Sequence, residues 1–334
     1  MEVCHSTEQS NGTSYSIVAV AIITLEVFAS LWINAFIVAV LCIAWVKKKT
    51  LNSSEKILLV LGCCRFWFLC ISWVYSFLAI ICPEYLCVHP IFQVVTATQN
   101  FFIFSDLWVS ASLCGFYCIK IANFRNSFFI YLKAKIDRIV PWLLLGSVVF
   151  SLFIAILAYD TLDKAICHNL NFTCKGIAWK ASIRMKEHFF PVFFITGLGF
   201  STSFVAVTFS ALLLLFSLWR HKCMMQTNSM KNLSMDAHIK AMKSILSFFI
   251  LYSINFIFLI LTLIYALNSQ NSMTFLIFIV QDAFPGVHSI TLIFSNPKLE
   301  KTLLRILSCV KCKVCIKKEL QQKLEPMHNV DLSL

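Results

Sequence analysis

The stretch FYCIKIANF, residues 116–124, ends an apolar run of about thirty residues with a single lysine, Lys120. A helix needs about 20 mostly apolar residues to cross the hydrocarbon core of a bilayer, and charged side chains are costly inside it. We therefore interpret Lys120 as the residue at which a membrane-spanning helix leaves the lipid. The polar turn that follows holds Asn123 and Arg125. The side of the membrane that this turn faces decides the topology of the chain.

The composition is typical of an integral membrane protein. The 334 residues are 59% hydrophobic and 13% charged, with a mean hydropathy of +0.80, whereas soluble domains are about 25% charged. Seven apolar runs are long enough to be transmembrane helices, so the sequence predicts an all-α, seven-helix membrane bundle. The predicted spans are residues 16–46, 56–81, 89–119, 139–159, 189–219, 244–267 and 273–295. The polar, acidic N-terminus lacks the basic segment of a cleavable signal peptide, so we expect the first run to remain as a span.

The distribution of basic residues orients the predicted bundle. The connections on the side of Lys120, together with the C-terminal tail, hold 22 of the 28 Lys and Arg residues. Cytosolic loops carry such an excess, which predicts an extracellular segment 1–15 and a cytosolic segment 296–334. This topology also explains the net charge of +12, so we expect contact with membrane lipid and no nucleic-acid partner. The sequons at Asn11 and Asn171 fall in outer segments and are candidate glycosylation sites.

The fifteen cysteines do not form a disulfide scaffold, because ten of them fall in spans or in the cytosol. The outer candidates are Cys4, Cys82, Cys87, Cys167 and Cys174. The sequence leaves their pairing open, and a bridge from Cys87 to Cys167 is one option.

The segment after the last span alternates apolar and basic residues, which predicts a short amphipathic helix on the inner leaflet. Cys309, Cys312 and Cys315 lie at its end, in a spacing that does not suit zinc without further ligands. They are either free thiols or palmitoylation sites beside a basic segment, and both interpretations stay open.

Ionisable groups inside the predicted spans indicate a polar core, since such groups face the interior of a bundle by default. At about 1.5 Å per residue, Arg65 lies roughly 13 Å, Ser289 roughly 10 Å and Asn34 roughly 20 Å from the cytosolic edge. We expect a buried cluster of Arg65, Asn34 and Ser289, extended by the deeper Asp106. The alternative is that each side chain snorkels and is solvated separately. With His288, these residues are the candidate polar activation core, beside a bend at 285–286.

Six sequence blocks occur in a fixed order from the first predicted span to the segment after the seventh. They are NAFIVAV (34–40), LGCCRF (61–66), LWVSASLCGFYCIKIANF (107–124), LLFSLWRH (214–221), AHIKAMKSILSFFILY (237–252) and HSITLIFSNPKL (288–299). In these blocks the chain resembles the bitter taste receptors, the type 2 taste receptor class of G protein-coupled receptors. The FYxxKIA pattern of residues 116–122 is the most specific match. Ala35 and Cys64 depart from the family's usual Gly and Ser.

The resemblance implies a plasma-membrane receptor that binds bitter small molecules, activates a gustducin- or Gi-type heterotrimeric G protein, and holds no cofactor or metal. The implied ligand contacts, in the outer half of the bundle, are Gln99, Asn100, Ile103, Asn255, Phe278 and Gln281; Phe104 is added as an apolar wall. The implied G-protein-coupling surface comprises Tyr117, Lys120, Arg220, His221, His238, Lys240 and Lys243. Because Gln99, Ile103 and Asp106 replace the Trp, Asn and small hydroxyl residue of many relatives, the ligand range cannot be copied from them.

The sequence is compatible with several alternatives. The buried amides serve equally well as contacts between helices, and each inner lysine is explained by positive-inside anchoring. Asp282 is a further candidate for contact with cationic ligands. A pheromone-type chemosensory receptor is the nearest alternative function. A transporter or channel is less favoured because the sequence lacks an inverted repeat. No motif of an enzyme is found, and the sequence leaves open the ligand, the Gα preference, and whether the chain forms homo- or hetero-oligomers.

Overall fold

The computed structural model describes the backbone of residues 2–86, 88–122, 126–168, 186–227, 232–267 and 273–309. These residues are helical almost throughout, and no strand occurs among them. The helices are α1 (Glu2–Lys48), α2 (Ser53–Ile81), α3 (Pro83–Leu86), α4 (Ile91–Ile121), α5 (Ser127–His168), α7 (Lys186–Thr227), α8 (Asn232–Leu267) and α9 (Met273–Ser295). Another helix follows at residues 297–309. The prediction of an all-α bundle is confirmed.

Six helices in the described part of the chain are long and apolar enough to cross a membrane: α1, α2, α4, α5, α7 and α8. Helix α9 has 23 residues, so at 1.5 Å per residue it is about 34 Å long, close to the thickness of the hydrocarbon core. The seven predicted spans fall on these six helices and α9, one on each. The chain is therefore a multi-pass membrane protein.

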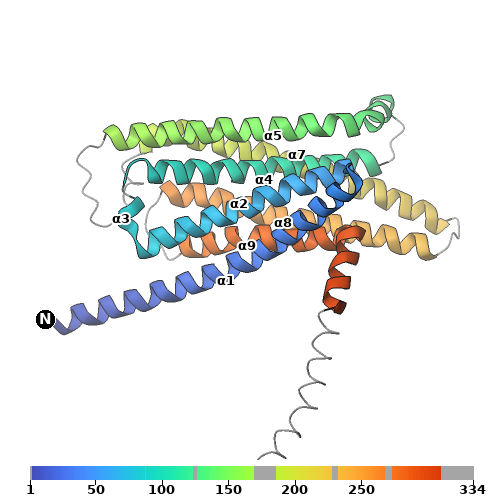
Figure 1. Ribbon diagram of the computed structural model, residues 1–334. Helices are drawn as coiled ribbons and strands as arrows, with labels where there is room; N and C mark the ends of the chain where they lie inside the picture. Colours follow the sequence, from blue (N-terminus) through green and yellow to red (C-terminus); the bar gives the residue numbers. More distant parts are fainter. Residues whose placement is uncertain are drawn as a thin grey trace, which may run out of the picture. The chain divides into compact units, whose positions relative to one another are not determined.

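Figure 1 shows the two ends of the bundle, and each end holds polar contacts between helices. At one end, Asp137 of α5 accepts hydrogen bonds from Ser53 Oγ and Lys120 Nζ, both at 2.7 Å. These bonds bring together the start of α2, the end of α4 and the first turns of α5. At the other end, His89 Nε2 lies 2.8 Å from Asp163 Oδ1, joining the entry to α4 with the end of α5. Helices α4 and α5 are thus antiparallel neighbours.

The apolar core surrounds α4, which contacts α2, α5 and α7. Phe104 of α4 is fully buried and its ring stacks on Phe200 of α7, with the centroids 5.0 Å apart. The close approach depends on Gly199, because a Cβ at that position would collide with the Phe104 ring. Phe204 and Phe256 stack in the same cluster at 4.2 Å. Close packing of this kind, rather than hydrophobic exclusion, holds helices together in lipid.

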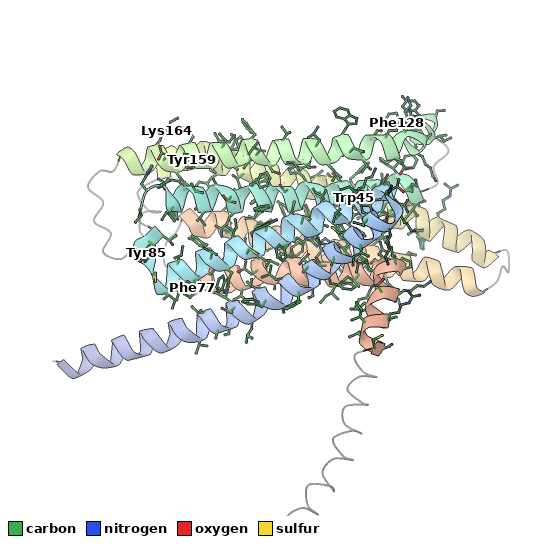
Figure 2. The ribbon with its side chains drawn as sticks, viewed as in Figure 1. Trp45, Phe77, Tyr85, Phe128, Tyr159 and Lys164 are labelled. Atoms are coloured by element: carbon green, nitrogen blue, oxygen red, sulfur yellow. The ribbon has the colours of Figure 1, made fainter. Side chains whose placement is uncertain are left out.

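Large apolar side chains also cover the outside of the bundle. Trp32, Leu25 and Trp142 are each more than 70% exposed, and Figure 2 shows Phe77 and Phe128 as further members of this exposed set. A soluble monomer does not leave apolar surface on this scale in water. A lipid environment explains it.

Residues 292–309 belong to a second compact unit of the chain. Its helix, residues 297–309, begins where the Asn296 side chain accepts a hydrogen bond from the Lys298 backbone N–H at 3.0 Å. Asn is a favoured N-cap and Pro297 occupies the first helical position, where its missing N–H is not needed. Local sequence therefore starts this helix. Its placement on a membrane stays a prediction.

Candidate functional site

The site is built around Arg65, which lies in the middle of α2. The buried face of α2 includes Leu58, Leu61, Arg65, Leu69 and Ser72. Their spacing of three or four residues places them on one side of the helix, so the guanidinium projects into the bundle with its apolar neighbours. Only 1% of the Arg65 side chain is exposed.

The guanidinium of Arg65 binds residues on two other helices. Its Nε donates to Asp106 Oδ1 of α4 at 2.5 Å, and Nη1 donates to Ser289 Oγ of α9 at 2.9 Å. Its Nη2 contacts His288 Nδ1 and lies 3.5 Å from Ser110 Oγ. Since a guanidinium can only donate, the His288 Nδ1 atom accepts. One side chain thus ties α2 to α4 and α9 through charge-assisted bonds.

The same network reaches α1 through Ser289. Ser289 Oγ donates to Asn34 Oδ1 at 2.7 Å, and Asn34 Nδ2 donates to the Ser30 carbonyl at 2.9 Å. The His288 ring packs between Phe248 and Phe284, with centroids at 4.8 and 5.3 Å. All five residues of the predicted polar core are therefore brought together: Asn34, Arg65, Asp106, His288 and Ser289. We call these residues, with Ser110, the Arg65 cluster.

A narrow cavity lies beside the Arg65 cluster, between α2, α4, α8 and α9. Its lining residues are Phe68, Ile103, Asp106, Leu107, Asn255, Leu259, Gln281, Phe284 and Pro285. The cavity volume is about 30 Å³, room for roughly one or two water molecules. A larger ligand would enter only if lining side chains moved. Ile103, Asn255 and Gln281 are the predicted ligand contacts that line it.

The other predicted ligand contacts lie elsewhere or are not described. Phe104 is buried in the apolar core and does not line the cavity. Gln99 and Asn100 are half-buried on α4 outside the lining, and Asn100 Nδ2 donates to the Thr96 carbonyl of its own helix at 2.9 Å. The Phe278 side chain lies outside the described residues.

Gln281 is held by a neighbouring helix. Its Nε2 donates to Thr262 Oγ1 of α8 at 2.6 Å. The cavity-lining amide on α9 is thus a direct link between α9 and α8, so displacing it would alter the contact between these helices.

Asp282, the further candidate for contact with cationic ligands, lies outside the cavity lining. It is 2% exposed, its Oδ1 accepts a hydrogen bond from Ser72 Oγ of α2 at 2.6 Å, and it does not line the cavity. Asp106 supplies the carboxylate there instead. Sequence reasoning missed Ser72, although it lies seven residues after Arg65 and therefore on the same face of α2.

The residues predicted to couple to a G protein lie on α4, α7 and α8. Lys120 binds Asp137, while Tyr117 packs against the cluster that contains Leu214 and Leu218. Arg220 and Lys243 are exposed. The side chains of the other members, His221, His238 and Lys240, lie outside the described part of the structure.

Only some of the candidate modification sites lie within the described part of the structure. Cys309 ends the helix at 297–309 and is exposed, and Cys82 carries a free thiol. Outside the described residues or side chains lie Asn11, Asn171, Cys312, Cys315 and the remaining outer cysteines, Cys4, Cys87, Cys167 and Cys174.

Comparison with known proteins gives consistent matches. The family model described as "Taste receptor protein (TAS2R)" matches residues 12–311. Taste receptor type 2 member 9 of Homo sapiens is 31% identical over 300 residues, covering 88% of this chain and 94% of that protein. Taste receptor type 2 member 123 of Mus musculus is 32% identical, over 86% of this chain and 91% of its own length. Taste receptor type 2 member 2 of Homo sapiens is 29% identical, with 91% and 98% covered.

Proposed function

The chain belongs to the taste receptor protein (TAS2R) family, and from this premise we propose that it is a plasma-membrane receptor for bitter-tasting small molecules. On binding an agonist it activates a gustducin-type heterotrimeric G protein. The observation that carries this proposal is the position of the Arg65 cluster directly beside a cavity lined by Asn255 and Gln281, since Asp106 belongs to both.

The cavity supports binding of compact, mainly apolar ligands. Most of its lining side chains are aromatic or aliphatic, and two amides offer hydrogen bonds. Ligand sites usually combine apolar walls with a few polar groups that fix orientation. Because the cavity is small in this arrangement, an agonist must displace lining side chains to enter. Gln281 and Phe284 are the candidates on α9.

Movement of α9 provides a route from the ligand to the inner surface. Gln281 is bonded to α8, Phe284 packs on His288, and His288 contacts Arg65. A ligand that repositions α9 therefore alters its contacts with α8 and with the Arg65 cluster. An agonist shifts the population toward the active arrangement only if it binds that arrangement better than the resting one. Tyr117, Lys120, Arg220 and Lys243 are our candidates for contact with the G protein.

The proposal is tested by screening bitter compounds on cells that express the chain with a promiscuous Gα subunit, read by calcium release. For the agonists found, we expect Asn255→Ala or Gln281→Ala to change the half-maximal concentration by about tenfold, the equivalent of one good hydrogen bond. Surface expression should stay intact. Thr98→Ala is the control, because Thr98 is half-buried, bonds its own helix at Val94 and does not line the cavity.

Unchanged potency of every agonist in both variants would remove these residues from the ligand site. Agonist-dependent nucleotide exchange on purified gustducin-type Gα tests the coupling directly. Ion flux in proteoliposomes without a G protein would instead support a transporter or channel.

A further inference from the structure

We propose that this receptor recognises an organic ammonium ion through Asp106, and that the ammonium group competes with Arg65 for that carboxylate. The inference rests on the proposed function, because it takes the cavity as the ligand site. It adds the chemical class of the ligand and the contact through which the ligand acts.

Asp106 lies at the boundary between the Arg65 cluster and the cavity. Its side chain is 12% exposed, whereas that of Arg65 is 1% exposed, and Asp106 lines the cavity while Arg65 does not. The hydrogen bond from Arg65 Nε uses Oδ1. A carboxylate has two oxygens with about four acceptor sites, so it can accept a second cationic donor from the cavity side.

The remaining lining suits a cation with an apolar body. None of the described lining residues is basic, so Asp106 is their one charged group. The rings of Phe68 and Phe284 also line the cavity. Phe284 already faces a cation, since Arg65 Cζ lies 5.9 Å from its ring centroid. Aromatic faces attract ammonium groups at such distances.

The carboxyl groups of the surrounding helices outnumber the one guanidinium of the cluster, Arg65, which also favours a cation. Within the described spans, Glu26, Asp106 and Asp282 lie among the helices that meet at Arg65. One oxygen of Asp282 and one of Glu26 are buried without a hydrogen-bond partner among the described residues. An incoming carboxylate would add to this acidic set, whereas an ammonium group would offset it.

Competition for Asp106 supplies a mechanism that neutral ligands would lack. When an ammonium group approaches, the carboxylate is shared, and the bond that ties α2 to α4 weakens. Arg65 keeps its contacts to His288 and Ser289, so it remains attached to α9. The ligand would thereby reduce the hold of Arg65 on α4 to its longer contact with Ser110 Oγ at 3.5 Å, while the guanidinium stays hydrogen-bonded to α9.

The test uses the full chain in cells with a promiscuous Gα and matched probes of equal length, namely 4-phenylbutylamine and 4-phenylbutan-1-ol, with homologues of shorter and longer chain. We expect the amines to activate at concentrations at least about tenfold lower than the alcohols, as a charge-assisted contact should. Asp106→Asn should abolish this preference at equal surface expression.

A gain-of-function variant keeps the test decisive if Asp106→Asn does not reach the surface. Asn255→Asp adds a second carboxylate to the cavity wall without altering Arg65, and should raise amine potency by about tenfold. Thr98→Asp is the matched control, because Thr98 lies on α4 outside the lining and bonds only the Val94 carbonyl of its own helix among the described contacts, and it should leave amine potency unchanged.

Three results would overturn the inference while leaving the proposed function in place. They are equal potency of amines and alcohols, an amine preference that survives in Asp106→Asn, and activation by neutral bitter compounds with no response to any amine of the series. Failure of every compound, charged or neutral, to activate any Gα would overturn the proposed function and the inference together.

Discussion

The guanidinium of Arg65 bonds three partners at once, which the single ammonium group of a lysine at this position could not do. It presents donors in a fixed planar fork, and three of its nitrogens reach Asp106, Ser289 and His288 at once. A single ammonium on a flexible stem would satisfy fewer partners and leave buried acceptors unpaired. The position of this fork, rather than its charge alone, joins three helices.

A double-substitution experiment measures how much the ion pair between Arg65 and Asp106 contributes to the stability of the receptor. Arg65→Met leaves the Asp106 carboxylate buried without its partner, so we expect it to lower the free energy of unfolding by about 3 kcal/mol. Arg65→Met combined with Asp106→Leu removes both charges and should recover at least half of that loss. The measurement is the thermal unfolding of detergent-solubilised receptor.

Additive losses in the double variant would show that Arg65 and Asp106 contribute independently. Ser112→Ala is a suitable control, since Ser112 bonds only the backbone of its own helix among the described contacts.

At the scale of elements, Gly286 lets α9 pack closely against Ser30 of α1. A Cβ placed on Gly286 of α9 would collide with the Oγ of Ser30 on α1 and lie 3.0 Å from its Cβ. One turn further along both helices, Ser289 and Asn34 share a hydrogen bond. Small residues that let helices approach are typical of membrane bundles. Here they keep the Arg65 cluster within reach of α1.

This contact predicts a suppressor pair. Gly286→Ala should destabilise the receptor by about 1–3 kcal/mol, because the added methyl group forces α1 and α9 apart. Ser30→Gly should restore part of the loss by removing the side chain that the methyl group meets. Gly146→Ala is the matched control, since nothing lies within 4 Å of a Cβ at that position. Thermal unfolding of Gly286→Ala, Ser30→Gly, their double variant and Gly146→Ala checks the prediction. A double variant less stable than Gly286→Ala alone would contradict it.

The elements also show where sequence reasoning reaches its limit. Apolar length predicted the helices well, and the depth of Arg65, Asn34 and Ser289 predicted their clustering. Rotation about each helix axis was not predictable, because helices in lipid are apolar on every face and lack the stripe that identifies an inner side. For this reason the position of Asp282, a candidate for contact with cationic ligands, could not be predicted, and the structure shows its carboxylate bound to Ser72. Phe104 was expected in the cavity wall, whereas it lies in the apolar core.

At the scale of the whole molecule, the contacts of Asp137 and Asp163 define two ends but not the side of the membrane that each one faces. The distribution of basic residues predicts which side each end faces. The end that carries Lys120 also carries the lysine-rich connection between α1 and α2. From the positive-inside rule we expect this end to face the cytosol, where a G protein is available.

The sidedness can be measured by glycosylation. We expect Asn171→Gln to remove endoglycosidase-sensitive mass from the receptor, because residue 171 is predicted to face the lumen during synthesis. Asn232→Gln is the matched control: its sequon, Asn232-Leu233-Ser234, is predicted to be cytosolic and should carry no glycan. A glycan at Asn232 would show that the loop holding this sequon faces the lumen, which contradicts the predicted orientation.

Epitope tags provide an independent measure of the same topology. A tag inserted before residue 10 should bind antibody on intact cells, whereas a tag after residue 325 should bind only after permeabilisation. The two ends are expected on opposite faces because the sequence predicts seven crossings of the bilayer, an odd number. If both tags are accessible on intact cells, the number of crossings is even. The basic loops then lose their common cytosolic face, and the surface formed by Tyr117, Lys120, Arg220 and Lys243 could not meet a cytosolic G protein as one unit.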